Sequence, residues 1–225
     1  MFDRKKELLA YLYGFLTKER QEKIKKNLFY RTRYITVILE DMYQSHNAAA
    51  VMRSCDALGV QNVHCIELKN KLEIKKNIAM GASKWLTVTN YTSEDSIKNP
   101  IVECIKTLKH EGYTIVATSP HGKKQLHELN LDSKIALMFG TEDEGLSQEA
   151  LGQADELITI PMYGFVESFN VSVSVALCLY DLTSRLRSSE IDWKLSEKET
   201  EELELIWLKL AIDRGDILER EFYKK

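Results

Sequence analysis

The sequence predicts an α/β fold in which helices cover both faces of a mostly parallel sheet. Short apolar segments rich in β-branched residues alternate along the chain with segments of helical period. These apolar segments are continuous, as expected of strands that are buried on both faces. With 225 residues, 44% of them hydrophobic, the chain is long enough to bury one sizeable core with terminal additions.

The first part of this core has the pattern of a βαβ unit. Residues 34–39 form a dense apolar run and are expected to be a strand, and a helix is expected from about Asn47. Gly59 supplies a C-terminal stop for that helix, and residues 63–68 are expected to be the second strand. This order is typical of a parallel strand pair.

The pattern repeats further along the chain. Asn99 and Pro100 are a favourable N-cap and first-turn pair for a helix that Gly112 ends. Strands are expected at residues 113–117, 135–139 and 157–160, a short helix at 147–153, and a long helix starting near Ser168. Regular alternation of strands and helices favours a parallel sheet.

We divide the chain into an N-terminal extension (residues 1–33), an α/β domain (34–187) and a C-terminal helical extension (188–225). The N-terminal extension is expected to form two short amphipathic helices, and the C-terminal one a linker and one helix that docks through its aromatic residues. The N-terminal extension carries ten basic residues against four acidic ones: Arg4, Lys5, Lys6, Lys18, Arg20, Lys23, Lys25, Lys26, Arg31 and Arg33. That surface can meet phosphates, or it is an ordinary charged helical surface.

The bulk composition limits the classes of function. A net charge of −3 does not by itself indicate a nucleic-acid binder, so the uneven distribution of charge along the chain matters more than its sum. The longest apolar run is too short to span a bilayer, and a soluble, cytoplasmic protein is expected. The cysteines lie far apart without metal-ligand spacing, which favours reduced, buried thiols: Cys55, Cys65, Cys104 and Cys178.

Three polar loops follow expected strands, where parallel sheets bind ligands. The first, residues 40–46, leads into the helix that carries Asn47 and Arg53. Six residues separate the two side chains, so they do not share a helix face. They can still meet one ligand if Asn47 lies in the turn. The alternative is that Asn47 is a helix N-cap and Arg53 a surface residue.

The second loop, residues 139–147, contains three consecutive acidic residues, Glu142 to Glu144. Its spacing of glycines resembles a phosphate-binding P-loop, but Leu146 stands at the lysine position and the carboxylates would repel phosphate. An acidic turn instead suits hydroxyls, amines or a cationic sulfonium. The alternative is a left-handed turn before a serine-capped helix.

The third loop, residues 160–170, leads to a helix that is expected to open with Ser168 and Asn170. Polar residues at a buried helix entrance can hold a small ligand, or they can simply cap a core helix. No residues form a Ser-His-Asp pattern, a dinucleotide-binding glycine motif or a zinc site. The residues alone therefore predict an α/β protein with polar loops at strand ends.

Three segments, in this order, resemble the motifs of the SPOUT ribose methyltransferases of the TrmH family: N-A-A-A-V-M-R-S-C-D-A-L-G-V, F-G-T-E-D-E-G-L-S and I-P-M-Y-G-F-V-E-S-F-N-V-S-V-S-V-A. The resemblance extends over residues 35–187, and G-A-S-K-W-L at 81–86 is similar to a further family segment. The basic N-terminal and tryptophan-bearing C-terminal extensions resemble the branch that methylates the D-loop guanosine, position 18, of tRNA.

The resemblance implies a SPOUT fold with a deep C-terminal trefoil knot, a homodimer and RNA, in particular tRNA, as partner. It implies S-adenosylmethionine as the methyl donor and no metal. The family binds this donor mostly through backbone groups, and the matching positions here are Thr118, Gly140, Ile160 and Phe169. Phe169 replaces the usual leucine, so we expect donor binding to persist with a reshaped adenine pocket.

The resemblance also implies the catalytic residues of the 34–187 domain. Arg53 matches the family's key arginine, and four polar positions match the residues around it: Asn47, Glu142, Ser168 and Asn170. A ribose hydroxyl is a very weak acid, so positioning and charge stabilisation should supply most of the rate. Because an arginine is nearly impossible to deprotonate, we expect Arg53 to stabilise a developing alkoxide and bind an RNA phosphate rather than act as a base.

The other polar residues are expected to support Arg53. Asn47 would fix Arg53 or the ribose, Ser168 and Asn170 would shape the floor of the knot, and Glu142 would orient neighbouring donors. Two alternatives share the core motifs: a methyltransferase for ribosomal RNA or another tRNA position, and a knotted RNA-binding protein without activity. The complete polar set argues against the second alternative. The target nucleotide is not encoded locally, because RNA is selected by shape and surface charge.

Overall fold

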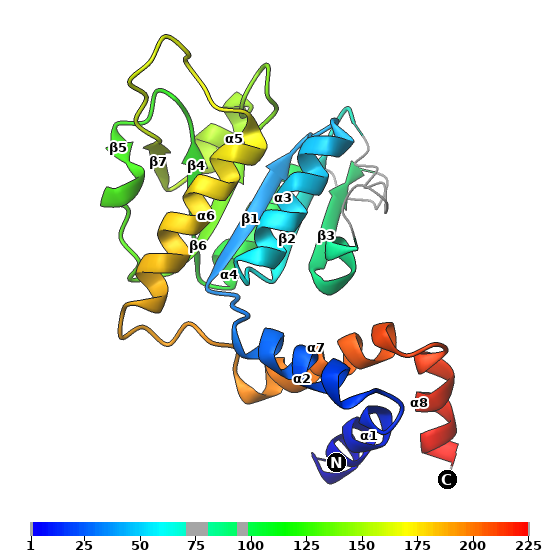
Figure 1. The fold of residues 1–225 in the computed structure, drawn as a ribbon. Coiled ribbons are helices and arrows are strands. Elements are labelled where there is room, and N and C mark those ends of the chain that lie inside the picture. The colour runs from blue at the N-terminus through cyan, green and yellow to red at the C-terminus, as the bar shows by residue number, and fades with distance from the viewer. Residues whose placement is uncertain (1, 71–80, 94–98, 225) are drawn as a thin grey trace. The chain divides into compact units, whose positions relative to one another are not determined.

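The computed structural model describes residues 2–70, 81–93 and 99–224 of the chain. They form two compact units, which are considered separately (Figure 1). Residues 32–193 make up the α/β unit. Residues 1–31 and 194–225 make up the helical unit, so the two ends of the sequence belong to one unit.

The α/β unit is built on a seven-stranded sheet with strand order β3-β2-β1-β6-β4-β7-β5. Every strand pair of the described residues is parallel. The elements are β1 (Ile35–Glu40), α3 (Ser45–Ala57), β2 (Asn62–Glu67), η1 (Ala82–Trp85), β3 (Thr87–Thr92), α4 (Pro100–His110), β4 (Tyr113–Thr118), β5 (Lys124–Gln125), η3 (Leu126–Glu128), β6 (Lys134–Phe139), α5 (Gln148–Gln153), β7 (Glu156–Thr159) and α6 (Val171–Arg187).

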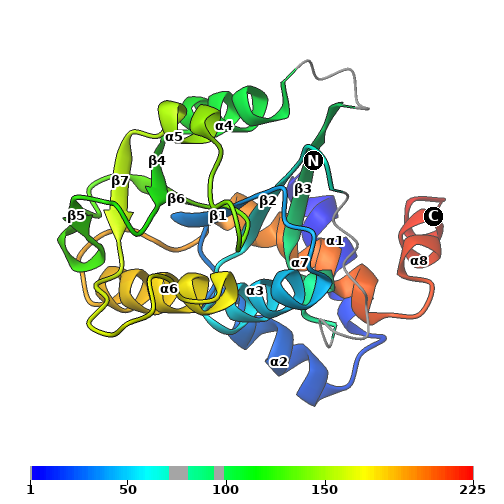
Figure 2. The same ribbon diagram turned by 90° about the horizontal axis from the view of Figure 1, so that it is seen from above.

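Helices cover both faces of this sheet, so the expected parallel α/β arrangement is confirmed. Figure 2 shows α3 and α6 on one face and α4 and α5 on the other. All six residues of β1 are buried, and they serve two cores. Val37 and Leu39 belong to the cluster that includes Met52 of α3, whereas Ile38 belongs to the cluster that includes Ile105 of α4. This explains why the strand is apolar on both faces.

Three elements differ from the sequence expectation. The strand β3 was not predicted, because its sequence T-V-T-N-Y-T is mostly polar. β3 lies at the edge of the sheet, where fewer side chains need to be buried. The two-residue β5 is too short to leave a pattern. The helix α6 begins at Val171 rather than near Ser168, because Asn170 is its N-cap and accepts a hydrogen bond from the Ser172 N–H.

The connection between β4 and β6, residues 119–133, is here called the crossing loop. β7 lies between β4 and β5, although β4 and β5 follow each other in sequence. The crossing loop therefore passes the end of β7, where the Ser119 N–H donates to the Ile158 oxygen at 3.0 Å. A Cβ on Gly122 would lie 2.4 Å from the Ile158 carbonyl carbon, so only glycine fits at this contact.

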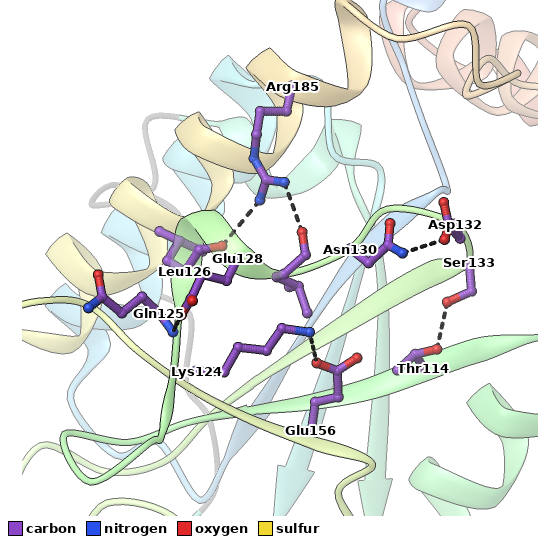
Figure 3. Close-up of polar contacts among 11 residues, drawn as sticks. Thr114, Lys124, Gln125, Leu126, Glu128, Asn130, Asp132, Ser133, Glu156 and Arg185 are labelled. Atoms are coloured by element: carbon purple, nitrogen blue, oxygen red, sulfur yellow. Dashed lines mark hydrogen bonds and ion pairs between the residues drawn. The ribbon is translucent and has the colours of Figure 1, made fainter.

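The second half of the crossing loop runs beside α6. Arg185 of α6 donates to the carbonyl oxygens of Leu129 at 2.8 Å and Leu126 at 3.2 Å (Figure 3). An ion pair of 2.6 Å between Lys124 and Glu156 joins β5 to β7 (Figure 3). The crossing loop is thus held both by β7 and by α6.

The helical unit contains α1 (Phe2–Tyr13), α2 (Lys18–Phe29), α7 (Glu197–Ala211) and α8 (Gly215–Lys224). Its core includes Leu8, Leu12, Leu28 and Trp207. The N-terminal residues form two helices, as expected, but the C-terminal residues form two helices rather than one. Phe15 lies beyond the end of α1 and is half-exposed.

The four cysteines are free and buried, in line with the expectation from their spacing. Burial raises the pKa of Cys65 and Cys178 to about 12, so these thiols stay protonated at neutral pH. No helix of the described residues is both long enough and apolar enough to cross a membrane.

His64 of β2 is a buried titratable group of the α/β unit. Its Nδ1 lies 3.3 Å from the Tyr91 hydroxyl, whereas its Nε2 is buried and has no hydrogen-bond partner among the described residues. Burial lowers the pKa of His64 from 6.5 to about 4, because the charged ring would lose its hydration. The unfolded chain therefore binds this proton at a higher pH than the folded chain does.

We expect His64 to destabilise the fold as the pH falls from about 6.5 to about 4. Over this window the unfolded state is protonated first, so its free energy falls relative to the folded state by up to about 3 kcal/mol. Urea unfolding of the wild type and of His64→Gln between pH 7 and 4 measures this contribution. The variant should lose stability less steeply, and the exposed control His121→Gln should follow the wild type. Parallel pH profiles for wild type and His64→Gln would contradict the assignment.

Candidate functional site

The carboxyl ends of β1 and β6 form the centre of the candidate site. These strands are neighbours in the sheet. The chain continues from β1 outward to β2 and β3 on one side, while β4 and β7 lie on the other side of β6. Parallel sheets bind ligands at such a reversal of strand order, because the loops diverge there and leave a crevice.

Three of the polar residues expected at the site meet in one hydrogen-bond network. Asn47 lies in the first turn of α3 and donates through Nδ2 to the Glu142 carboxylate at 3.1 Å. Asn170, the N-cap of α6, donates to the same carboxylate at 3.0 Å and to the Asn47 oxygen at 3.1 Å. The loops after β1, β6 and β7 are therefore joined at one point.

The alternative interpretation of Asn47 as a helix N-cap is wrong. The N-cap of α3 is Gln44, and Asn47 is a buried residue inside the helix. Its amide also donates to the Gln44 side chain at 2.7 Å. The Tyr43 hydroxyl donates to Asp143 at 3.0 Å, which adds a second bond between the first and second loops. Asn47 is thus committed to the network rather than to its own helix end.

Arg53 and Ser168 do not join this network. Both side chains are exposed, and neither makes a hydrogen bond or ion pair with any residue within 2–70, 81–93 or 99–224. Arg53 follows Asn47 by six residues on α3, which turns its side chain by about 240° around the helix axis. Its guanidinium remains available to an anionic ligand.

The positions expected to bind a cofactor follow three adjacent strands. Gly140, Thr118 and Ile160 lie at the carboxyl ends of β6, β4 and β7, which are neighbours in that order. The Thr118 hydroxyl donates to the Met138 carbonyl oxygen at 3.0 Å, which ties the end of β4 to β6. Phe169 lies in the 160–170 loop and is partly exposed.

Gly140 begins a closed turn at the end of β6. The Thr141 N–H donates to the Gly145 oxygen at 3.0 Å, and the Gly145 N–H donates back to the Thr141 oxygen at 3.1 Å. A Cβ on Gly140 would lie 2.0 Å from the Gly145 oxygen. A side chain is therefore excluded, and the turn presents Glu142 toward Asn47 and Asn170.

A small hollow lies beside the network. It is lined by Met42, Tyr43, Gln44, Asn47, Thr141, Glu142 and Val171. These residues come from the first and second polar loops and from the first turns of α3 and α6, and they include Asn47 and Glu142 of the network. Among the described residues, no cluster of histidine, cysteine and carboxylate side chains could hold a metal ion.

Two acidic residues at the end of β1 position the site, and sequence reasoning assigned neither of them a role. Glu40 is buried and accepts hydrogen bonds from the Ser147 N–H at 2.8 Å and the Ser147 hydroxyl at 2.5 Å. Asp41 adopts a left-handed conformation with φ of 52° and accepts from the N–H groups of residues 68–70. The signal was an acidic pair directly after a buried strand, where carboxylates are costly unless paired.

We expect Glu40→Ala to loosen the second loop and to lower stability. The substitution leaves the Ser147 N–H without its acceptor, which costs about 1–3 kcal/mol for a buried donor. Urea unfolding measures the loss, with Glu144→Ala as the control because Glu144 lies exposed in the same turn. If both variants unfolded at the wild-type urea concentration, Glu40 would have no positioning role.

The fold and the site define a parallel α/β protein with a polar crevice at the reversal of strand order and a turn that only glycine permits. A family model described as the SpoU rRNA Methylase family matches residues 34–180. The chain belongs to this family, which confirms the resemblance found in its motifs.

Named relatives agree with this assignment. The chain is 41% identical over 94% of its length to a protein of Borreliella burgdorferi that is named tRNA (guanosine(18)-2'-O)-methyltransferase, and covers 94% of that protein. A Thermus thermophilus protein of the same name is 32% identical over 73% of this chain and 82% of its own.

Two solved structures share the fold. The Aquifex aeolicus TrmH/SpoU tRNA modifying enzyme superposes with a TM-score of 0.75 at 28% identity, covering 87% of this chain and 98% of that chain. The SpoU methyltransferase AviRb from Streptomyces viridochromogenes, solved in complex with AdoMet, superposes with a TM-score of 0.61 at 20% identity over 73% of this chain and 62% of its own.

Proposed function

We propose that the protein is a cytoplasmic methyltransferase that moves a methyl group from S-adenosylmethionine to the 2′-hydroxyl of guanosine 18 in tRNA. One observation carries the proposal: Asn47, Glu142 and Asn170 meet at the carboxyl edge of the sheet. The helix α3 that carries Asn47 also carries the exposed Arg53, whose guanidinium makes no hydrogen bond or ion pair with a described residue. The identity of 41% over most of a relative named for this reaction supports the choice of nucleotide.

The residues at the strand ends suit the proposed donor. The Gly140 turn at the end of β6 brings bare backbone close to the crevice. Thr118 ends the neighbouring strand β4, and Ile160 follows β7, the next strand along. S-adenosylmethionine, when bound, supplies an electrophilic methyl carbon on a positively charged sulfur. The acidic turn at residues 142–144 favours such a cation by charge. Phe169 at the edge of the 160–170 loop offers an aromatic contact for an adenine ring.

We assign to Arg53 the role of activating the ribose 2′-hydroxyl. The ribose oxygen would attack the methyl carbon and displace neutral S-adenosylhomocysteine as the carbon–sulfur bond breaks, and its proton would pass to solvent water. Negative charge develops on that oxygen during the attack. A guanidinium beside it stabilises this charge and binds a neighbouring RNA phosphate through its fork of N–H groups. It does not accept the proton, because arginine stays charged at any physiological pH. Asn47 and Asn170 shape the ribose site as members of the network, and Glu142, which accepts from both Nδ2 groups, fixes the orientation of both amides.

The proposal includes a trefoil knot, in which the 160–187 segment passes through the crossing loop. Three contacts support it. β7 is enclosed between β4 and β5, which are consecutive in sequence. Gly122 of the crossing loop touches the backbone of Ile158 so closely that a Cβ has no room. Arg185 at the far end of α6 holds the second half of the same loop (Figure 3).

The proposal also includes a homodimer through α6 and the loop before it. Val173, Leu177 and Tyr180 are exposed at helical spacing along α6, and Tyr163 and Phe165 are fully exposed in the loop. Exposed apolar side chains in this number favour burial against a second copy. Light scattering after gel filtration tests this: the wild type should elute as a dimer and Leu177→Asp as a monomer. A monomeric wild type would refute it.

Two measurements test the proposed reaction. Calorimetric titration with S-adenosylmethionine should show one donor site for each chain, and the Gly152→Ala control, away from the crevice, should bind equally well. Unmodified tRNA and fragments of ribosomal RNA should then be offered with labelled donor, and the modified nucleotide mapped. Methylation of ribosomal RNA alone would overturn the choice of tRNA, and donor binding without any transfer would favour a knotted RNA-binding protein.

A further inference from the structure

The two basic helices of the helical unit differ in how their lysines are paired. Lys6 of α1 lies 3.3 Å from Glu197 and 3.8 Å from Glu201 of α7, and Lys5 lies 4.0 Å from Glu201. The positive charge of α1 is therefore largely neutralised within the unit. Lys23 and Lys26 of α2 have no ion-pair partner among the residues that the structure describes. The positive charge that can attract a bound anion, such as an RNA phosphate, therefore comes mainly from α2.

The second half of α2 and its C-cap, residues 23–30, also carry two exposed aromatic residues. Phe29 is 55% and Tyr30 48% exposed, and their rings meet edge to face with centroids 5.1 Å apart. The ammonium of Lys194 lies 4.0 Å from the centre of the Phe29 ring. This stretch contains no acidic residue. We call residues 23–30 with Lys194 the aromatic platform.

We propose that the aromatic platform binds an unpaired base of the RNA substrate by stacking, with Lys23 and Lys26 binding the adjacent phosphates. This inference rests on the proposed function, and it assigns a separate contact for the RNA outside the strand-end crevice. Bases that are not paired stack on exposed aromatic rings, and a lysine beside the ring adds cation–π attraction. Without a binding partner, two neighbouring half-exposed aromatic rings would lower the solubility of the protein.

Charge selects RNA over an apolar protein partner as the occupant. Lys23 and Lys26 lie on the same helix as Phe29, and the Lys194 ammonium lies over the Phe29 ring, so an apolar partner that covered the platform would bury ammonium groups at a high cost. Phosphates on either side of a stacked base match this arrangement of rings between cations. Base stacking and lysine–phosphate attraction respond differently to salt, so their contributions to RNA affinity can be measured separately.

Binding of an unmodified tRNA transcript at several salt concentrations tests the platform. Phe29→Ala should weaken binding about tenfold while leaving the salt dependence unchanged, because stacking releases no counterions. Phe29→Trp should bind like the wild type. Lys26→Ala should instead reduce the slope of log affinity against log salt by about 0.7–0.9, the value for one lost phosphate contact. A fully paired RNA duplex should show no Phe29 effect.

Matched controls come from the same unit. Phe15 is 50% exposed and also packs edge to face on a tyrosine, Tyr11, so Phe15→Ala removes a comparable ring outside the platform. Lys6→Ala removes a lysine that is already paired. Both variants should bind tRNA like the wild type. Equal affinities for Phe29→Ala and Phe15→Ala, with an unchanged melting temperature, would overturn the platform.

Two further outcomes separate this inference from the proposed function. If the wild type methylates tRNA and Phe29→Ala does so with unchanged KM and kcat, the platform fails while the proposed function stands. If the wild type binds tRNA but transfers no methyl group, the proposed function fails while the platform is still measured by affinity. A change in the association state of Phe29→Ala by light scattering would show that a second chain covers these rings, and would refute the platform.

Discussion

Arg53→Ala is expected to lower kcat for methyl transfer by at least about 100-fold, the usual loss when a group that stabilises transition-state charge is removed. The fold and the donor affinity should stay unchanged, because the Arg53 side chain is exposed and makes no hydrogen bond or ion pair with a described residue. Single-turnover transfer to tRNA with saturating enzyme measures the chemical step. Calorimetry with S-adenosylmethionine and the melting temperature complete the comparison.

Two variants sharpen this test. Lys106→Ala removes an exposed cation from α4, on the other face of the sheet, and should retain wild-type activity (Figure 2). Arg53→Lys keeps the charge but loses the planar fork of donors, so it should recover only a small part of the activity. Wild-type turnover in Arg53→Ala would remove Arg53 from the mechanism. Loss of the fold in that variant would contradict its exposed position.

Gly140→Ala is expected to have the second large effect, on both stability and donor affinity. The added Cβ would lie 2.0 Å from the Gly145 oxygen, so the turn after β6 must open and Glu142 must move away from Asn47. Overpacking of this kind typically costs about 1–3 kcal/mol. Urea unfolding and calorimetric titration with the donor should show both losses.

Gly152→Ala is the matched control for Gly140→Ala. A Cβ on Gly152 meets no atom within 4 Å, and the residue lies inside α5, so alanine should stabilise the chain by about 0.5–1 kcal/mol. The same substitution should therefore have opposite effects at the two glycines. Equal stability of both variants would show that the β6 turn tolerates a side chain and does not fix the crevice.

The inner strands could be predicted from the sequence, whereas the edge of the sheet could not. Burial on both faces keeps the middle of β1 and of β6 mostly apolar, and this leaves a clear run of hydrophobic residues in the sequence. The edge strand β3 has the polar sequence T-V-T-N-Y-T and leaves no such run. The expected start of the last helix near Ser168 was wrong by three residues, because Asn170 rather than Ser168 caps it.

The candidate site was predictable in its parts but not in its assembly. Each polar loop could be found after its strand, yet the spacing does not reveal that β1 and β6 are neighbours. That order brings Asn47, Glu142 and Asn170 together. The roles of Arg53 and Ser168 came from family resemblance, and both residues stay predictions because neither contacts the network.

Methylation of a tRNA transcript carrying 2′-deoxyguanosine at position 18 tests the central claim most directly. The protein is incubated with labelled S-adenosylmethionine and with either the deoxy transcript or the otherwise identical all-ribose transcript. The label in the RNA is then counted and its position mapped. We expect close to one methyl group per all-ribose transcript, on the 2′-oxygen of guanosine 18, and none on the deoxy transcript. Equal labelling of both transcripts, or no labelling of either, would contradict the proposed reaction.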